Sequence, residues 1–156
     1  MKAKIFFVIL AIAIFAAAFL ILSQQKDVEQ GNLLEIRLVN SEGKEIKIFA
    51  EIADNETELA TGLSGRGKIP ENRGMFFIFP EEGTLSFWMK DMKFPLDMIF
   101  FDSQFNIVDI NENAQPCRTV IGCPIYPSKK PAKYVLEINA GLIRKYNIKI
   151  GDRAII

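Results

Sequence analysis

Two cysteines stand close together in the last third of the chain. Cys117 and Cys123 enclose a C-x5-C loop inside a proline-rich stretch. Outside the cytoplasm such a pair forms a disulfide by default, whereas in the cytosol it would be a redox or metal couple. The spacing is not the C-x-x-C of catalytic thiol pairs. With the topology argued below, we expect a disulfide that shapes the loop and contributes roughly 2 to 2.5 kcal/mol in the chain-entropy model.

Five carboxylates fall within 22 residues, in a pattern that suggests either a hard-metal cluster or a paired general acid and base. They are Asp91, Asp97, Asp102, Asp109 and Glu112. The simpler interpretation places Asp102 in a hairpin turn and Asp109 and Glu112 on a wet strand face. Only Asp97, which stands between Leu96 and Met98, is then expected to be enclosed.

An enclosed carboxylate needs partners, because burying an unpaired charge is prohibitively costly. Asp97 is therefore expected to accept backbone N–H groups or to pair with a basic side chain. Arg66, Arg73 and Lys90 are the candidate partners. An arginine could clamp either Asp97 or the carboxylate of a ligand in two parallel hydrogen bonds.

The stretch from Phe87 to Asp102, FWMKDMKFPLDMIFFD, holds the chain's only tryptophan among many apolar residues. Strand alternation places Phe87 and Met89 on one face and Trp88 and Lys90 on the other. The second face is either part of the core or an aromatic-walled cleft with a cation beside it. We name six candidate ligand-binding residues: Arg66, Arg73, Trp88, Lys90, Asp91 and Asp97.

Composition removes several classes of function. The 156-residue chain has no histidine, which excludes a Ser-His-Asp or Cys-His site and a histidine-bound zinc within the chain. Its 19 basic and 19 acidic residues balance. A near-neutral surface lacks the clustered positive charge that nucleic-acid binding requires. We expect no metal, no cofactor and no nucleic-acid partner.

The N-terminal sequence predicts a membrane-spanning segment. Two lysines in residues 1–4 precede 18 apolar residues, 5–22, with no charge, Pro or Gly. A helix of that length spans about 27 Å, close to the roughly 30 Å of a bilayer core. It is either an uncleaved anchor or a signal sequence that is removed. The positive-inside rule then places the remainder outside the cytoplasm, either on the cell membrane or, after cleavage, secreted.

The rest of the chain predicts one domain of class α+β, mostly β. Residues 1–22 form the anchor or signal, 23–33 a polar linker and 34–156 the extracytoplasmic domain. We expect about 7 to 8 strands in a barrel-like or sandwich arrangement with two short helices. The expected strands are 34–39, 45–50, 75–79, 84–90, 98–101, 107–110, 134–138 and one within 147–156. The expected helices are 55–63, capped by Asp54, and 140–146. The long connection 111–131 is suspected of function.

A set of spaced matches resembles the domain of unknown function 192 family of small prokaryotic proteins, which are often made for export. It covers residue 35 to the C-terminus. The matching residues are Gly62-Leu63, Arg66, Arg73-Gly74-Met75, Phe87-Trp-Met-Lys90, Pro95-Leu-Asp-Met98, Pro116-Cys117, Cys123-Pro-Ile-Tyr126, Tyr134-Val-Leu-Glu137, Asn139-Ala-Gly141 and Gly151-Asp152. The resemblance implies a compact, mostly β domain and no settled activity. At position 91 the family usually has Asn where this chain has Asp.

Three functions remain open on this basis. The leading hypothesis is a membrane-tethered, non-enzymatic module whose cleft, around Trp88, Lys90, Asp97, Arg66 and the bridged loop, binds a small anionic ligand or a partner protein. The first alternative is an envelope enzyme that uses Asp91 and Asp97 with Lys90. The second is a structural subunit of an envelope assembly that is contacted through residues 5–22.

Overall fold

The computed structural model describes residues 14–15, 33–117, 119 and 122–156. The predicted anchor, 5–22, therefore lies outside the described residues except for Ile14 and Phe15, which are helical and exposed. None of the helices in the described ranges is long and apolar enough to cross a membrane. The anchor thus stays a prediction from the sequence.

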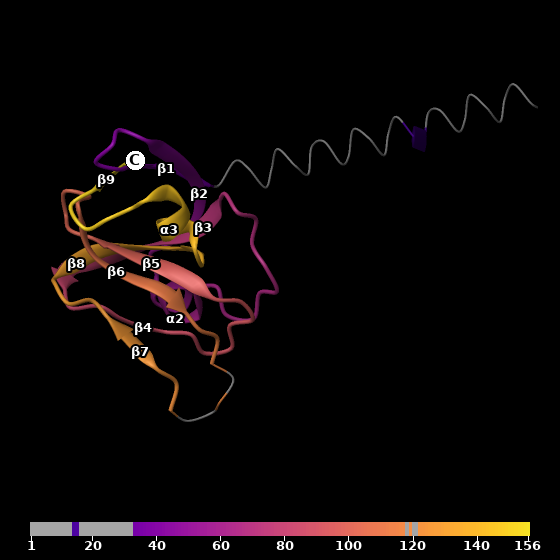
Figure 1. Cartoon of the computed structure of the whole chain (residues 1–156). Coiled ribbons are helices and arrows are strands. Elements are labelled where there is room, and N and C mark those ends of the chain that lie inside the picture. Colours follow the sequence, from indigo (N-terminus) through magenta and orange to yellow (C-terminus); the bar gives the residue numbers. More distant parts are fainter. Residues whose placement is uncertain (1–13, 16–32, 118, 120–121) are drawn as a thin grey trace, which may run out of the picture. The chain divides into compact units, whose positions relative to one another are not determined.

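Residues 34–156 form one compact, mostly β unit, and its described part holds nine strands and two short helices (Figure 1). The strands are β1 (Leu34–Val39), β2 (Glu45–Ala53), β3 (Arg73–Gly83), β4 (Ser86–Trp88), β5 (Leu96–Phe101), β6 (Ile107–Ala114), β7 (Ile125–Pro127), β8 (Ala132–Asn139) and β9 (Arg153–Ile155). The helices are α2 (Glu56–Thr61) and α3 (Leu142–Tyr146).

Seven strands make one curled sheet in the order β6-β5-β8-β3-β2-β1-β9. The β2–β3 pair is parallel and the other pairs are antiparallel. The two edges approach each other at one end, where the Ile107 amide donates to the Asp152 carbonyl at 2.7 Å and the Ala154 amide to the Phe105 carbonyl at 2.9 Å. The sheet is therefore a half barrel, and β4 and β7 form a separate two-stranded ribbon.

Strand alternation gives the sheet two buried faces. One face carries Phe76, Ile99 and Phe101 and packs against Leu142 and Ile143 of α3. The opposite face is covered by the α2 segment and by the β4–β7 ribbon. It carries Met75, Phe77, Met98, Phe100 and Val135. Two small cores thus lie on either side of the central strands β3, β8 and β5.

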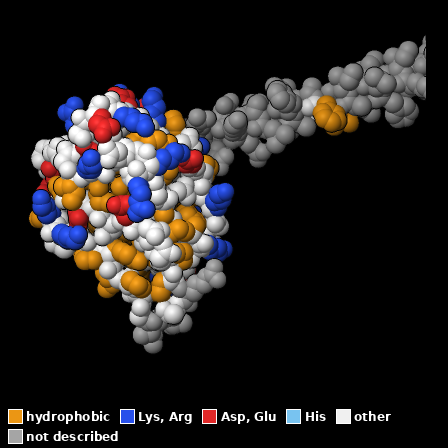
Figure 2. All heavy atoms as spheres, viewed as in Figure 1, with side chains coloured by type: hydrophobic (Ala, Val, Ile, Leu, Met, Phe, Trp, Pro, Cys, Tyr) orange, Lys and Arg blue, Asp and Glu red, His pale blue; other side chains and the backbone are white. Residues whose placement is uncertain are grey.

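Both signs of charge occur on the surface. Figure 2 shows basic and acidic side chains interspersed over the upper part of one face, and hydrophobic side chains gathered lower down, toward β4 and β7. On that ribbon Trp88 pairs with Ile125, and these side chains are 53% and 65% exposed. The ribbon therefore presents apolar surface to solvent.

Local patterns predicted the first elements well. The hairpin over 34–50 is confirmed as β1 and β2, with Leu38 opposite Ile46. The helix is shorter than expected, and its N-cap is Asn55 rather than Asp54. Asn55 has extended backbone angles, and its Oδ1 accepts from the Glu58 amide at 3.1 Å, which is the geometry of an N-cap.

Two predictions about the strands and their carboxylates were wrong. Residues 80–83, expected to separate the strands 75–79 and 84–90, instead form the end of β3, where the register with β8 shifts between Ile78 and Gly83. Asp109 was placed on a wet face but is 1% exposed, because the segment after β7 folds back over β6 and the Lys129 amide donates to Asp109 at 2.7 Å. Asp102 does lie in the predicted turn, where it accepts from the Gln104 and Asn106 amides.

Candidate functional site

A small cavity lies between the end of α2 and the β4 strand. It has a volume of about 20 Å³, enough for one water-sized group. Its lining combines apolar and aromatic side chains with one acidic residue: Leu59, Ala60, Thr61, Gly62, Leu63, Ser64, Phe77, Phe87, Trp88, Met92 and Glu137. We call it the Glu137 cavity.

Glu137 forms the acidic part of the lining. It lies on the central strand β8, directly between Met75 of β3 and Met98 of β5, and is 4% exposed. No described residue donates a hydrogen bond to its carboxyl, and burial is the one influence on its pKa. Burial raises the pKa of the Glu137 carboxyl from 4.5 to about 8. Most molecules therefore carry a protonated Glu137 at pH 7.

Aromatic rings wall the Glu137 cavity. The Phe77 and Phe87 rings meet edge to face with their centroids 5.0 Å apart, a favoured arrangement for packed aromatics. Trp88 stands at the solvent side and is 53% exposed. The Lys90 ammonium lies 5.3 Å from the centroid of the Trp88 ring, within the range of a cation–π contact. The expected strand 84–90 is shorter, ending at Trp88, but the predicted alternation in burial holds, since Met89 is fully buried while Trp88 is exposed.

Backbone hydrogen bonds hold the rim of the cavity together. The Ser64 hydroxyl donates to the Lys90 carbonyl at 2.9 Å, and the Gly65 amide donates to the Asp91 carbonyl at 3.1 Å. Asp91 has a φ of 57°, in the left-handed region that Asn and Asp tolerate better than most residues. The departure from Asn at position 91 therefore keeps the backbone conformation that this turn needs.

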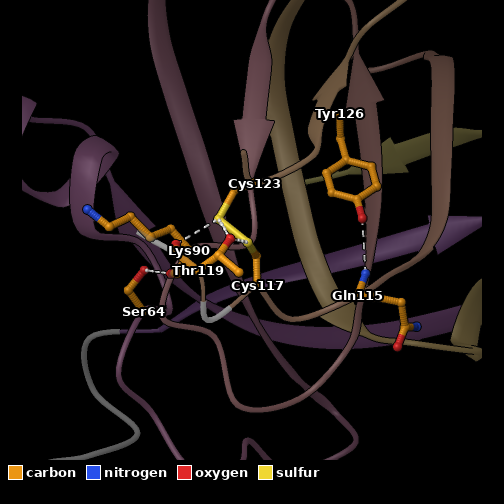
Figure 3. Close-up of a disulfide and its surroundings, with 7 residues drawn as sticks. All are labelled: Ser64, Lys90, Gln115, Cys117, Thr119, Cys123 and Tyr126. Carbon is orange, nitrogen blue, oxygen red and sulfur yellow. Dashed lines mark hydrogen bonds between the residues drawn. A yellow bond between two sulfur atoms is a disulfide. The ribbon is translucent and has the colours of Figure 1, made fainter. Parts of the chain in front are cut away.

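The disulfide is joined to this rim through Cys117. Cys117 and Cys123 are bonded, which confirms the predicted pairing (Figure 3). The Cys117 amide donates to the Met89 carbonyl at 2.9 Å, and the Asp91 amide donates to the Cys117 carbonyl at 3.0 Å. Figure 3 shows the Lys90 side chain extending away from the sulfur atoms. Cys117 thus braces the segment that follows Trp88 through these backbone hydrogen bonds.

A second, larger cavity of about 280 Å³ adjoins the first and shares Thr61 and Gly62 with it. Its lining includes the ion pair between Arg66 and Glu51, so we call it the Arg66 cavity. The guanidinium binds both carboxylate oxygens, with Nη2 to Oε2 at 2.7 Å. These hydrogen bonds lower the pKa of the Glu51 carboxyl and raise that of Arg66, against the opposing effect of burial.

Comparison with known proteins identifies the family of this chain. The model of the DUF192 family, described as uncharacterized ACR, matches residues 37–156. The chain belongs to the DUF192 family.

A UPF0127 protein of Pyrococcus furiosus is 30% identical over 115 residues, which cover 72% of this chain and 90% of that protein. Two crystal structures share the fold of this DUF192 domain. One, of a candidate transcription regulator from Sinorhizobium meliloti, is 34% identical with a TM-score of 0.73 and covers 78% of this chain and 91% of the other. The second, a protein of unknown function from Novosphingobium aromaticivorans, is 29% identical with a TM-score of 0.73 and covers 80% and 85%.

The predicted ligand-binding residues of this DUF192 domain are only partly brought together. Trp88 lines the Glu137 cavity and Arg66 lines its neighbour. Lys90 and Asp91 hold the rim through their backbones. Arg73 begins β3 and acts electrostatically on Glu51. None of the three basic candidates forms an ion pair with Asp97 within the described ranges.

Asp97 is enclosed as predicted, and its partners are backbone groups. Its side chain has no solvent exposure. One oxygen accepts from the Asn113 amide at 2.8 Å and the other from the Ile143 amide at 3.0 Å. The carboxylate thus ties β5 to β6 and to the first turn of α3, where the helix dipole favours an anion. We therefore remove Asp97 from the ligand-binding residues.

Glu137 and Glu51 are the two acidic residues that sequence reasoning missed. Glu137 stood inside an apolar run, Tyr134-Val-Leu-Glu-Ile138, and a lone acid within a buried strand was a usable signal, since such groups are rarely enclosed without a partner. Glu51 gave no such signal. It is an acid in an alternating strand, and only the folded chain places it beside Arg66.

Proposed function

We propose that this DUF192 domain is a binding module for an organic cation, and that the Glu137 cavity takes a primary ammonium group. The observation that carries this proposal is the lining itself. It combines aromatic rings with one carboxyl, and its described residues include no Lys or Arg. Aromatic walls around an acidic group are the usual composition of sites for ammonium ligands. A small anion, our expectation from the sequence, would meet a carboxyl in this lining, while the Lys90 ammonium lies over the Trp88 ring outside the lining.

The size of the cavity limits the ligand further. A space of about 20 Å³ admits one small group rather than a whole metabolite. An ammonium on an alkyl chain meets this limit, because only the charged head needs to enter the cavity while the chain stays outside it.

Protonation gives the proposal a specific signature. The unliganded carboxyl is mostly protonated at pH 7 because its pKa is about 8. A cation beside Glu137 favours the charged form, so binding should expel the proton. Affinity should therefore rise with pH until Glu137 is ionised before the ligand arrives.

The test is calorimetric titration of the full-length chain, in detergent solution, with n-pentylamine. At pH 7, in buffers of different ionisation enthalpy, we expect release of most of one proton for each amine bound, because the pKa of the unliganded carboxyl is raised above 7. The variant Glu137→Gln should lose most of the binding and all of the proton release. The control Glu56→Gln, which alters an exposed acid on α2, should keep both. Binding that survives Glu137→Gln, or that releases no proton, would contradict the proposal.

We also propose that the module is tethered to the membrane by residues 5–22 and faces away from the cytoplasm. The charge bias around this apolar segment and the disulfide between Cys117 and Cys123 support the placement. A reporter that is active only outside the cytoplasm, fused after Ile156, should be active. The same fusion carrying Lys in place of Leu10 and Ile14 should be inactive. Activity of a cytoplasmic reporter at Ile156 would overturn this topology.

A further inference from the structure

We propose that the ligand is a free diamino acid of the lysine type. Its side-chain ammonium enters the Glu137 cavity, and its α-ammonium and α-carboxylate rest on the Glu51–Arg66 ion pair of the Arg66 cavity. This inference depends on the proposed function and names the class of compound that the two adjoining cavities fit together.

The Arg66 cavity has the chemistry that a zwitterion needs. Arg66 and Glu51 are held side by side, with their side chains 37% and 44% exposed, so both charges are open to solvent. A guanidinium is suited to a carboxylate, and its N–H groups exceed the two that Glu51 occupies. A carboxylate likewise keeps acceptor capacity for an ammonium. The α-amino and α-carboxyl groups of an amino acid carry the complementary pair of charges.

The two cavities meet at a glycine, Gly62. Gly62, which lines both, ends α2 with a φ of 50°. A Cβ atom at this position would lie 3.1 Å from Cζ of Phe77 and 3.9 Å from Oε2 of Glu137. Glu137 and Met75, which line different cavities, are also direct neighbours across β8 and β3. The Phe77 ring thus closes the space beside Gly62, and an alkyl chain that runs past Gly62 from one charged region to the other displaces this ring by a few tenths of an ångström.

This arrangement distinguishes the free amino acid from related cations. An alkylamine offers the ammonium but leaves the Arg66 cavity without charged partners. A lysine inside a polypeptide has its α-groups in peptide bonds and loses both charges. Of these three compounds, only the free diamino acid offers an oppositely charged group to each of Glu137, Glu51 and Arg66.

The experiment compares three probes on the full-length chain by calorimetry: n-pentylamine, L-lysine and lysine blocked as its Nα-acetyl amide. We expect L-lysine to bind about tenfold more tightly than either of the others, the scale of one charge-assisted contact. Arg66→Ala should reduce the ratio of the L-lysine and pentylamine affinities to about 2 or less. Lys68→Ala, an exposed cation two residues along the same loop, should leave that ratio near ten.

The outcomes separate this inference from the proposed function. If pentylamine binds with proton release and L-lysine binds no more tightly, the inference is wrong while the ammonium site stands. If blocked lysine binds as tightly as L-lysine, the α-groups make no contact with Glu51 and Arg66, and a free amino acid as the specific ligand is excluded. If none of the three probes binds, the ammonium site itself is wrong.

Discussion

Glu137→Gln is expected to stabilise the domain strongly at alkaline pH, while changing its stability little in acid. The folded chain holds the Glu137 carboxyl in a nearly dry site between Met75 and Met98. Ionising it there is costly because no described group compensates the charge. Glutamine has nearly the same shape and never ionises, so it avoids this cost at any pH.

The direction of this pH dependence follows from the direction in which folding shifts the pKa of Glu137. The pKa of Glu137 is raised from 4.5 to about 8 on folding, so between these values the folded chain binds the proton more tightly than the unfolded one. The stability contributed by this proton is complete below pH 4.5 and is lost as the pH rises through 8. At about 1.4 kcal/mol for each pH unit, the loss amounts to about 5 kcal/mol.

Urea unfolding of both proteins at pH 4.5, 6, 7.5 and 9, followed by the fluorescence of Trp88, measures this difference. We expect the two free energies of unfolding to agree within about 1 kcal/mol at pH 4.5 and the variant to exceed the wild type by about 5 kcal/mol at pH 9. Titration of Glu51, whose pKa is lowered, has the opposite pH dependence, but both proteins share it. If the difference between the two free energies of unfolding stays constant from pH 4.5 to 9, the pKa of Glu137 is not raised on folding.

Asp97→Ala is expected to cost about 4 kcal/mol of unfolding free energy. The substitution leaves the Asn113 and Ile143 amides without their acceptor, and each buried unsatisfied donor costs about 1 to 3 kcal/mol. It also removes the connection that fixes α3 on the sheet. The loss should appear as a lower midpoint in urea with an unchanged dependence on denaturant.

Two further variants make this prediction specific. Asp97→Asn keeps one good acceptor and should lose about half as much as alanine. Asp91→Asn, an exposed carboxylate on the cavity rim, should stay within about 0.5 kcal/mol of the wild type, because both residues tolerate the left-handed backbone at this position. A stable Asp97→Ala protein that had lost amine binding would instead restore Asp97 to the binding site.

Features that depend on neighbours along the chain could be read from the sequence. The period of two over 34–39 and 45–50 predicted the hairpin, and the same period placed Phe87 and Met89 on the face opposite Trp88. The two cysteines stand six positions apart, and their disulfide was predicted from the expectation that the domain lies outside the cytoplasm. These results follow from local geometry, since side chains alternate along a strand whatever it pairs with.

Features that depend on strand order could not be read in this way. The sheet places β8 between β3 and β5, and only this order encloses Glu137 between Met75 and Met98. Asp109 was predicted to be solvent-exposed, because the sequence of one strand does not reveal that the distant segment around Lys129 covers it. Burial of a polar residue is thus decided by distant segments.

The sequence by itself determined the family, the mostly β class, the paired cysteines and the alternation around Trp88. The tertiary structure alone decided that Asp97 is a structural carboxylate, that Arg66 pairs with Glu51, and that Glu137 faces a cavity beside Gly62. The physical reason is that charges are positioned by contacts between residues far apart in the chain. A residue's own neighbours say whether a strand forms, but not which strand lies next to it.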